Sequence, residues 1–191
     1  MGISRIAHGA YADVLDMKDG TVVKAYRRQT FTTRPVEDWR DHDAITRAFF
    51  EAETKTYERI QRHTELALFT PEFHGRIDPC GLQDLIDAPE LGYVRNCGIR
   101  LERIAGEDIK VAHLEPLMQA EVERVLWRLR DEVAAGNVWD ASCFIPGSRE
   151  RFTLIDFATL NMFVDCLEQL ERDGRFSNQQ MEQWGLRHEA S

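Results

Sequence analysis

The sequence predicts an α+β protein that begins with a small antiparallel β-sheet and continues with a mostly helical second half. Two observations lead to this class. Short alternating apolar segments joined by turn residues fill the first 26 residues, as in a meander of strands. Helical spacing of apolar residues then appears over residues 42–63 and again over residues 117–136, where a glycine closes the second helix.

Three short strands are predicted near the start of the chain, over residues 3–7, 12–17 and 21–26. The last two are joined by Lys18-Asp19-Gly20, and an Asp-Gly pair between alternating apolar segments is a strong hairpin signal. A polar loop over residues 27–41 then leads to the first helix.

Later strands are shorter and less regular. Residues 70–77 are predicted to form a strand that Gly75 interrupts, and residues 99–104 form another. A loop that includes Pro146-Gly147 is predicted after the long helix. Residues 152–156 then give a last short apolar strand.

Length and composition indicate one soluble globular domain or two small lobes that share a cleft. The 191 residues are 43% hydrophobic and 30% charged, which excludes collagen-like, coiled-coil and disordered classes. The pattern changes from strands to helices near Ala105-Gly106, so we expect lobes over residues 1–105 and 106–191. The formal charge of −9 argues against nucleic acid or an anionic membrane as a partner.

Cysteine spacing indicates a reducing compartment, and the short apolar runs indicate that no segment spans a membrane. Cys80, Cys97, Cys143 and Cys166 form no Cys-x-x-Cys pair, so we predict free thiols in place of zinc ligands or disulfides. Every apolar run is far shorter than the ~20 residues that span a bilayer, and the first residues lack a signal-peptide core. We expect a cytoplasmic protein, or an effector delivered into another cell.

The most informative residue is Glu53. It lies four residues after Phe49 and four before Tyr57, so its carboxylate falls inside an apolar helical stripe and needs a cationic partner. Lys24 is the candidate, because it projects from its strand on the same face as Val22. The alternatives are a Glu53 that reaches solvent from the helix edge and a Lys24 that protects a sheet edge.

A neighbouring carboxylate, Glu51, is expected on the solvent side of the same helix. Arg47 and Lys55 stand four residues to either side of it, at the spacing of helical surface ion pairs. We therefore predict an ordinary surface charge at this position.

The segment IAHGAYADV can be aligned with a glycine-rich loop that covers nucleotide phosphates. Gly9 keeps one glycine, Ala7 and Ala12 take the outer positions, and Tyr11 and Val14 match the aromatic and aliphatic ones. Small residues at these positions still permit a close approach of the backbone.

Asp156 ends the apolar strand FTLID and is followed by Phe157. A carboxylate that emerges from a buried strand into a cleft suits Mg²⁺ on a triphosphate, because Mg²⁺ prefers hard oxygen ligands. The alternative is an aspartate that caps the next helix.

Taken in order, these features resemble the protein-kinase-like superfamily over roughly residues 3–165, and in particular its compact kinases and aminoglycoside-phosphotransferase-like members. The resemblance implies a bilobal fold in which Lys24 pairs with Glu53 and holds the phosphates of ATP, while Asp156 binds Mg²⁺. It places the adenine at a hinge over residues 104–106. The implied nucleotide-binding residues are Gly9, Tyr11, Val14, Lys24, Glu102, Ile104 and Asp156.

The catalytic loop departs from the family pattern. Asp140, 16 residues before Asp156, is the candidate base that accepts or orients the acceptor hydroxyl. Five residues later, where the family has a metal-binding asparagine, stands Ile145, and a shifted alignment would put Val138 at the base position. Asp140 as a structural turn residue stays an alternative. Two asparagines outside the motif position could assist with metal, Asn137 and Asn161.

The 35 residues after Asp156 contain no Ala-Pro-Glu motif, so regulation by a long activation loop is not expected. The acceptor would then be recognised elsewhere, for example by the loop over residues 27–41, which carries Arg27, Arg28 and Arg34. That basic loop is equally interpretable as an ordinary solvated surface.

The sequence thus predicts a minimal kinase that uses ATP and Mg²⁺ to phosphorylate a hydroxyl of a protein or small molecule. One alternative is a pseudokinase that senses a nucleotide or binds a protein without catalysis. Another is an unrelated α+β interaction domain, in which Lys24 and Glu53 would lie apart.

Overall fold

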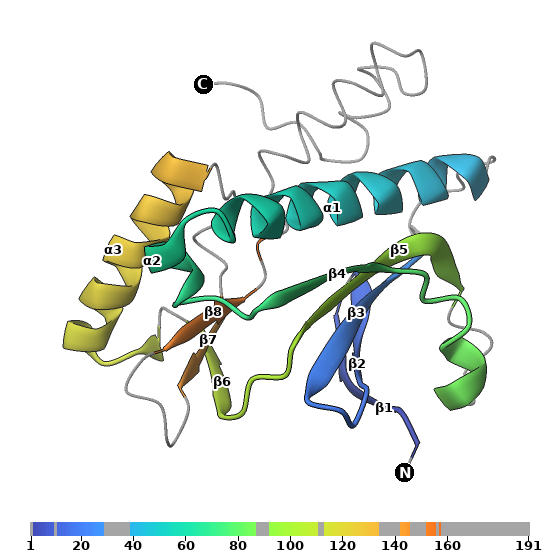
Figure 1. The fold of residues 1–191 in the computed structure, drawn as a ribbon, viewed down its shortest axis with the longest axis horizontal. Helices are drawn as coiled ribbons and strands as arrows, with labels where there is room; N and C mark the ends of the chain where they lie inside the picture. Colours follow the sequence, from blue (N-terminus) through green and yellow to red (C-terminus); the bar gives the residue numbers. More distant parts are fainter. Residues whose placement is uncertain are drawn as a thin grey trace.

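The structure is a computed structural model in which residues 2–9, 11–28, 39–86, 92–110, 113–133, 142–145, 152–155 and 157 are described. Asp140 and Asp156 lie outside this described part. The architecture is α+β, as the sequence predicts. A long helix, α1, lies across one face of an antiparallel sheet, and a second helix, α3, stands beside the C-terminal end of α1 (Figure 1).

The main sheet of the described chain has five strands in the spatial order β1-β2-β3-β5-β4, and every neighbouring pair is antiparallel. Antiparallel neighbours place directly opposed side chains on the same face, so the strand register decides which residues meet. The strands are β1 (Ser4–His8), β2 (Ala12–Asp16), β3 (Thr21–Arg27), β4 (Phe73–Ile77) and β5 (Tyr93–Glu102).

The predicted hairpin between β2 and β3 is confirmed. Lys18 and Gly20 both have positive φ, 62° and 87°, which is the conformation that tight hairpin turns require. The Asp16 carboxylate accepts the Lys18 backbone N–H at 2.9 Å and also binds Arg103 Nε at 3.0 Å. Because Arg103 follows β5 directly, this turn holds the chain that leaves the sheet.

Gly75 introduces an irregularity into β4, the strand that was predicted over residues 70–77. Its φ of 112° is in the region that favours glycine, and the register between β4 and β5 shifts between Phe73 and Gly75. An extra residue of this kind is a β-bulge, which bends an edge strand. The regular strand is confined to Phe73–Ile77.

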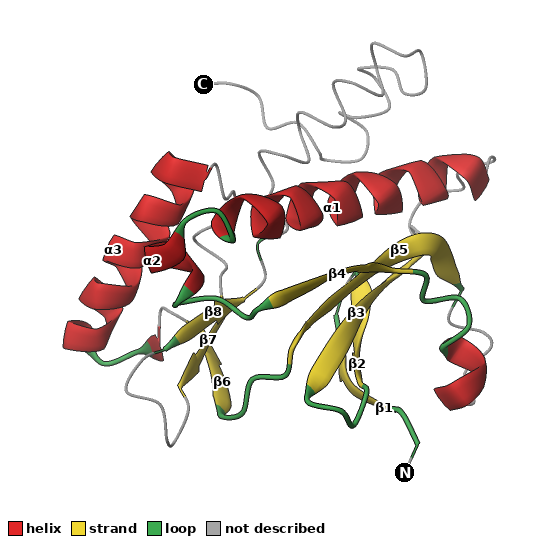
Figure 2. Cartoon of the chain, in the orientation of Figure 1, coloured by secondary structure: helices red, strands yellow, loops and turns green. Residues whose placement is uncertain are grey.

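The first predicted helix is present as α1 (Trp39–Ile60), shifted by three residues towards the N-terminus. Its buried side carries Phe49, Phe50 and Tyr57, which join one apolar cluster with Val22 of β3 and other side chains of the sheet. A short helix, α2 (Thr64–Ala67), follows immediately and was not predicted. Figure 2 shows α2 against α3.

The opposite face of the sheet has its own smaller apolar cluster, built around Leu15, Val23 and Tyr93. A 3-10 turn that was not predicted, η1 (Gln83–Ile86), contributes Ile86 to its cover. Two predicted free cysteines, Cys80 and Cys97, are free thiols in the structure. Burial raises the pKa of the Cys97 thiol to about 12, so it is protonated at neutral pH.

The second half contains more strand than predicted. The helix α3 (Pro116–Val133) is confirmed, but the described residues also form a three-stranded antiparallel sheet in the order β6-β7-β8. The strands are β6 (Glu107–Lys110), β7 (Ser142–Ile145) and β8 (Thr153–Ile155). The prediction of a loop at Ser142–Ile145 was wrong, because a serine followed by three apolar residues carries no periodicity and β7 depends on partners from distant parts of the chain.

The two halves share one hydrophobic core. Leu129 of α3 and Leu154 of β8 lie in the same cluster as Ile60 of α1, and all three are almost completely buried. The Leu154 backbone N–H also donates to the Phe69 carbonyl at 2.7 Å. In the described part of the chain, no helix combines the length and apolar character that crossing a bilayer would take.

The Asp16 turn predicts a measurable acid response. Hydrogen bonds from the Lys18 backbone and side chain hold the pKa of Asp16 below its usual value, so folding gains stability above the unfolded pKa of about 3.9 and loses it as pH falls through the lower folded pKa. We expect Asp16→Asn to be less stable than wild type at pH 7 and the difference to shrink below about pH 4. Urea unfolding from pH 7 to pH 2.5 measures this.

The control is Asp131→Asn on the exposed surface of α3, whose side chain is 69% exposed. A difference between wild type and Asp16→Asn that stays constant across this pH range would show that the Asp16 contacts do not stabilise the fold.

Candidate functional site

The predicted ion pair between Lys24 and Glu53 is present. Lys24 Nζ donates to both carboxylate oxygens of Glu53, at 2.9 Å to Oε1 and 2.7 Å to Oε2. The Glu53 side chain is fully buried, whereas the Lys24 side chain keeps 16% of its surface exposed. The pair joins α1 to β3 across the core and leaves part of the lysine accessible.

The surroundings of Lys24 are apolar. In the strand register Lys24 stands opposite Val14 of β2 and Ile99 of β5, and directly opposed residues project on the same face. Ile99 is completely buried and Val14 packs against the main core. The Lys24 side chain therefore leaves the sheet between two apolar neighbours, and the low polarity of such surroundings strengthens its attraction to Glu53.

Tyr26 is a member of the site that the sequence analysis missed. Its buried hydroxyl donates a hydrogen bond to Glu53 Oε2, and Lys24 Nζ lies 5.7 Å from the centre of its ring. Since Tyr26 stands two residues after Lys24 on one strand, alternation alone places both on one face. The Glu53 carboxylate is thus held by a cation and a neutral donor.

The β1–β2 turn lies at one end of β3, and the connection that follows Glu102 lies at the other end. The Gly9 N–H donates to the Ala12 carbonyl at 2.9 Å, and the Gly9 carbonyl accepts from the Arg27 guanidinium. The Tyr11 ring stacks on Phe49 of α1 with centroids 4.0 Å apart, and burial raises the pKa of its hydroxyl. The turn is therefore held towards α1, one helical turn before Glu53.

Glu102 and Ile104 stand at the opposite end of the sheet. Glu102 pairs with Thr21, three register positions from Lys24, or about 10 Å along the strand. The Glu102 N–H donates to the Glu72 carbonyl at 2.8 Å, and its carboxylate accepts the Glu72 N–H at 3.3 Å. Ile104 is half-buried in the connection to β6. Lys24 thus lies midway between the β1–β2 turn and this connection.

A pocket of about 430 Å³ lies beside Glu102, where the end of α1 meets the chain before β4. Its walls include Tyr57, Leu68 and Pro71. Lys24 is not among the residues that line it, so this hollow is separate from the ion pair.

Phe157, two residues after β8, packs against α1. Phe157 is 1% exposed and its ring meets that of Tyr57 edge to face, with centroids 5.4 Å apart. Tyr57 in turn stacks on Phe73 of β4 at 6.0 Å. Tyr57 follows Glu53 by one helical turn, so the end of β8 packs under the part of α1 that carries the ion pair. The sequence analysis did not predict this aromatic stack.

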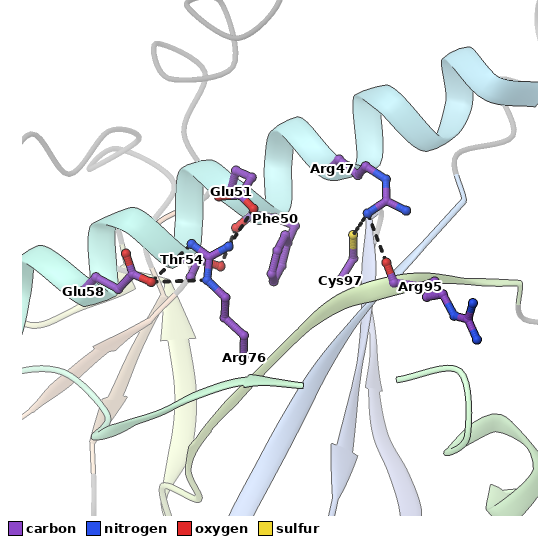
Figure 3. A network of polar contacts seen from close by, with 8 residues as sticks. All are labelled: Arg47, Phe50, Glu51, Thr54, Glu58, Arg76, Arg95 and Cys97. Atoms are coloured by element: carbon purple, nitrogen blue, oxygen red, sulfur yellow. Dashed lines mark hydrogen bonds and ion pairs between the residues drawn. The ribbon is translucent and has the colours of Figure 1, made fainter. Parts of the chain in front are cut away.

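Glu51 differs from its prediction as a simple surface charge. Its Oε1 accepts a hydrogen bond from Arg76 Nη1 of β4 at 2.7 Å (Figure 3). Arg47, one of its expected helical neighbours, donates instead to the Arg95 carbonyl of β5 at 3.1 Å. The reason is tertiary: this flank of α1 lies over β4 and β5, which offer partners that helical spacing alone does not reveal.

Comparisons with family models, curated proteins and solved structures find no match for this chain. Within the described residues, no group of three or more histidine, cysteine or acidic side chains could hold a metal ion. The function of the site has to be inferred from its own geometry and chemistry.

The ion pair predicts a specific loss of stability. Lys24→Ala removes the ammonium group that contacts both oxygens of the buried Glu53 carboxylate, so we expect the free energy of unfolding to fall by about 1–3 kcal/mol. Lys18→Ala is the matched control, because Lys18 pairs with Asp16 and its side chain is 37% exposed. Chemical denaturation at pH 7 measures both. Equal effects of the two substitutions would contradict the buried pair.

Proposed function

We propose that this protein is a phosphotransferase of the protein-kinase-like type that transfers the γ-phosphoryl group of ATP to a hydroxyl of a protein or small molecule. The observation that carries the proposal is the bidentate Lys24–Glu53 pair, which is buried yet leaves part of the lysine accessible. It lies midway along β3, between the Gly9 turn and the connection after Glu102.

Burying an ion pair costs desolvation free energy, which suggests that this pair has a role besides stability. Apolar side chains of similar volume would often stabilise a core as well as a buried ion pair does, so stability alone does not explain Lys24 among Val14 and Ile99. A lysine held in one orientation is a ready cation for a phosphate. In an unrelated interaction domain Lys24 and Glu53 would lie apart, so their contact argues against that alternative.

The proposed roles follow the geometry along β3. Adenine would lie near Glu102 and Ile104, with the phosphates beside Lys24 and under the turn that holds Gly9 and Tyr11. Val14 would form an apolar wall next to the lysine. Mg²⁺ would be held by Asp156, which follows Ile155 and precedes the buried Phe157.

Transfer would be an in-line displacement. The acceptor oxygen forms a bond to the γ-phosphorus while the bond from that phosphorus to the bridging β–γ oxygen breaks, and ADP leaves with the electron pair. Asp140 would accept the proton of the acceptor hydroxyl. Lys24, oriented by Glu53 and Tyr26, would offset the negative charge of the phosphates.

A pseudokinase that binds nucleotide without catalysis is the second candidate. The observation that favours it is Ile145 at the end of β7, because an aliphatic residue there replaces the asparagine that binds metal in the family pattern. Binding and turnover have to be measured separately to distinguish the two.

The test combines a thermal shift with a transfer assay. ATP with Mg²⁺ at a hundredfold excess over Kd should stabilise the protein by about 2.7 kcal/mol, and radiolabelled ATP should yield a labelled acceptor or autophosphorylated chain. We expect Lys24→Ala to abolish both signals and Asp156→Ala to abolish transfer, while Lys18→Ala keeps both.

The outcomes separate the candidates. A shift without transfer would favour the pseudokinase. Neither a shift nor transfer, or signals unaffected by Lys24→Ala, would overturn the nucleotide site.

A further inference from the structure

An arginine of the sheet holds α1 at two points. Arg76 of β4 donates from Nη1 to Glu51 at 2.7 Å, and from Nε and Nη2 to Glu58 at 3.3 and 3.2 Å. Figure 3 shows the guanidinium between these two glutamates of α1. Because they are seven residues apart, they stand two turns apart on one flank of the helix.

The two contacts of Arg76 define the orientation of α1 on the sheet, which apolar packing alone does not define. Burial of hydrophobic surface is non-directional, so it holds α1 on the sheet without defining its rotation or its position along its own axis. A planar guanidinium with two fixed acceptors does define them. The Phe50 ring, 5.3 Å from the Arg76 guanidinium carbon, further restricts its plane.

Glu53 lies between the two anchored positions of α1. Apart from the contacts of Glu53 itself, other polar attachments of this helix stand before Glu51 or after Glu58. Before Glu51, the Thr46 hydroxyl donates to the Arg27 carbonyl at 2.9 Å and Arg47 donates to the Arg95 carbonyl at 3.1 Å. After Glu58, Arg59 donates to the Val133 carbonyl at 3.4 Å. Arg76 is therefore the attachment whose two contacts bracket the turn that carries the buried carboxylate.

We propose that Arg76 is a positioning residue, which acts through Glu51 and Glu58 to keep Glu53 in bidentate contact with Lys24. Its significance for catalysis rests on the proposed phosphotransferase function, but its effect on Lys24 does not. The three side chains are 41%, 38% and 38% exposed, so the fold should tolerate their replacement.

The chain offers a direct readout, because it has only four lysines, at positions 18, 24, 55 and 110. An amine-reactive acetylating reagent at pH 7.5, followed by peptide mass spectrometry, measures the labelling rate of each. Lys55 is exposed on α1 and serves as the internal reference.

Arg128→Gln is the matched control. The Arg128 side chain is also 41% exposed and also binds two glutamates, but these lie on α2 and α3. It has the same kind of surface contacts without touching α1. Circular dichroism confirms that each variant is folded before labelling.

We expect Arg76→Gln to raise the labelling rate of Lys24 relative to Lys55 by roughly two- to fivefold. Arg76→Lys, which reaches one glutamate at a time, and Glu58→Gln, which removes one anchor, should give smaller increases. Arg128→Gln should leave the ratio unchanged. An unchanged ratio in Arg76→Gln, or an equal rise in Arg128→Gln, would overturn the positioning role.

Nucleotide binding by the wild-type protein is measured separately, by the thermal shift with ATP and Mg²⁺. Its absence would overturn the phosphotransferase proposal, whereas the Lys24 labelling ratio alone decides the role of Arg76.

Discussion

The buried carboxylate of Glu53 is the constraint on which this structure depends. A charge with no exposed surface is tolerated only where cations and hydrogen-bond donors meet it, and here Lys24 and Tyr26 of β3 do so. This requirement joins α1 to one strand of the sheet. The strand register sets Val14 and Ile99 beside the lysine, whose side chain keeps 16% of its surface exposed.

The larger apolar cluster connects the site around Glu53 to the second half of the chain. The rings of Phe73, Tyr57 and Phe157 contact one another in sequence and connect β4, α1 and the end of β8. A shift of α1 that disturbs Glu53 would therefore also disturb the packing of Phe157. The two halves that the composition separates near residue 105 are mechanically joined through this stack and through Leu129 and Leu154.

Much of this arrangement could be predicted from local pattern. Alternation identified the strands around the Lys18–Gly20 turn, and helical spacing identified α1 and α3. The Lys24–Glu53 pair followed because each residue is a charge within an apolar pattern, and such a charge requires a counter-charge.

What could not be predicted depends on neighbours in space. The partner of Glu51 is Arg76 because α1 lies over β4, and no spacing along the helix reveals this. Likewise β7 is a strand through its pairing with β6 and β8. Asp140 and Asp156 are not among the described residues. The roles of Glu102 and Ile104 in binding a nucleotide stay predictions.

The central claim, that Lys24 is a phosphate-binding cation oriented by Glu53, is tested most directly by NMR of the four lysine side chains during titration with ATP and Mg²⁺. We expect the Lys24 side-chain resonance to move and saturate, while that of Lys55, which is exposed on α1, does not. A Lys24 resonance that stays in place at millimolar ATP, or one that moves no more than Lys55, would contradict it.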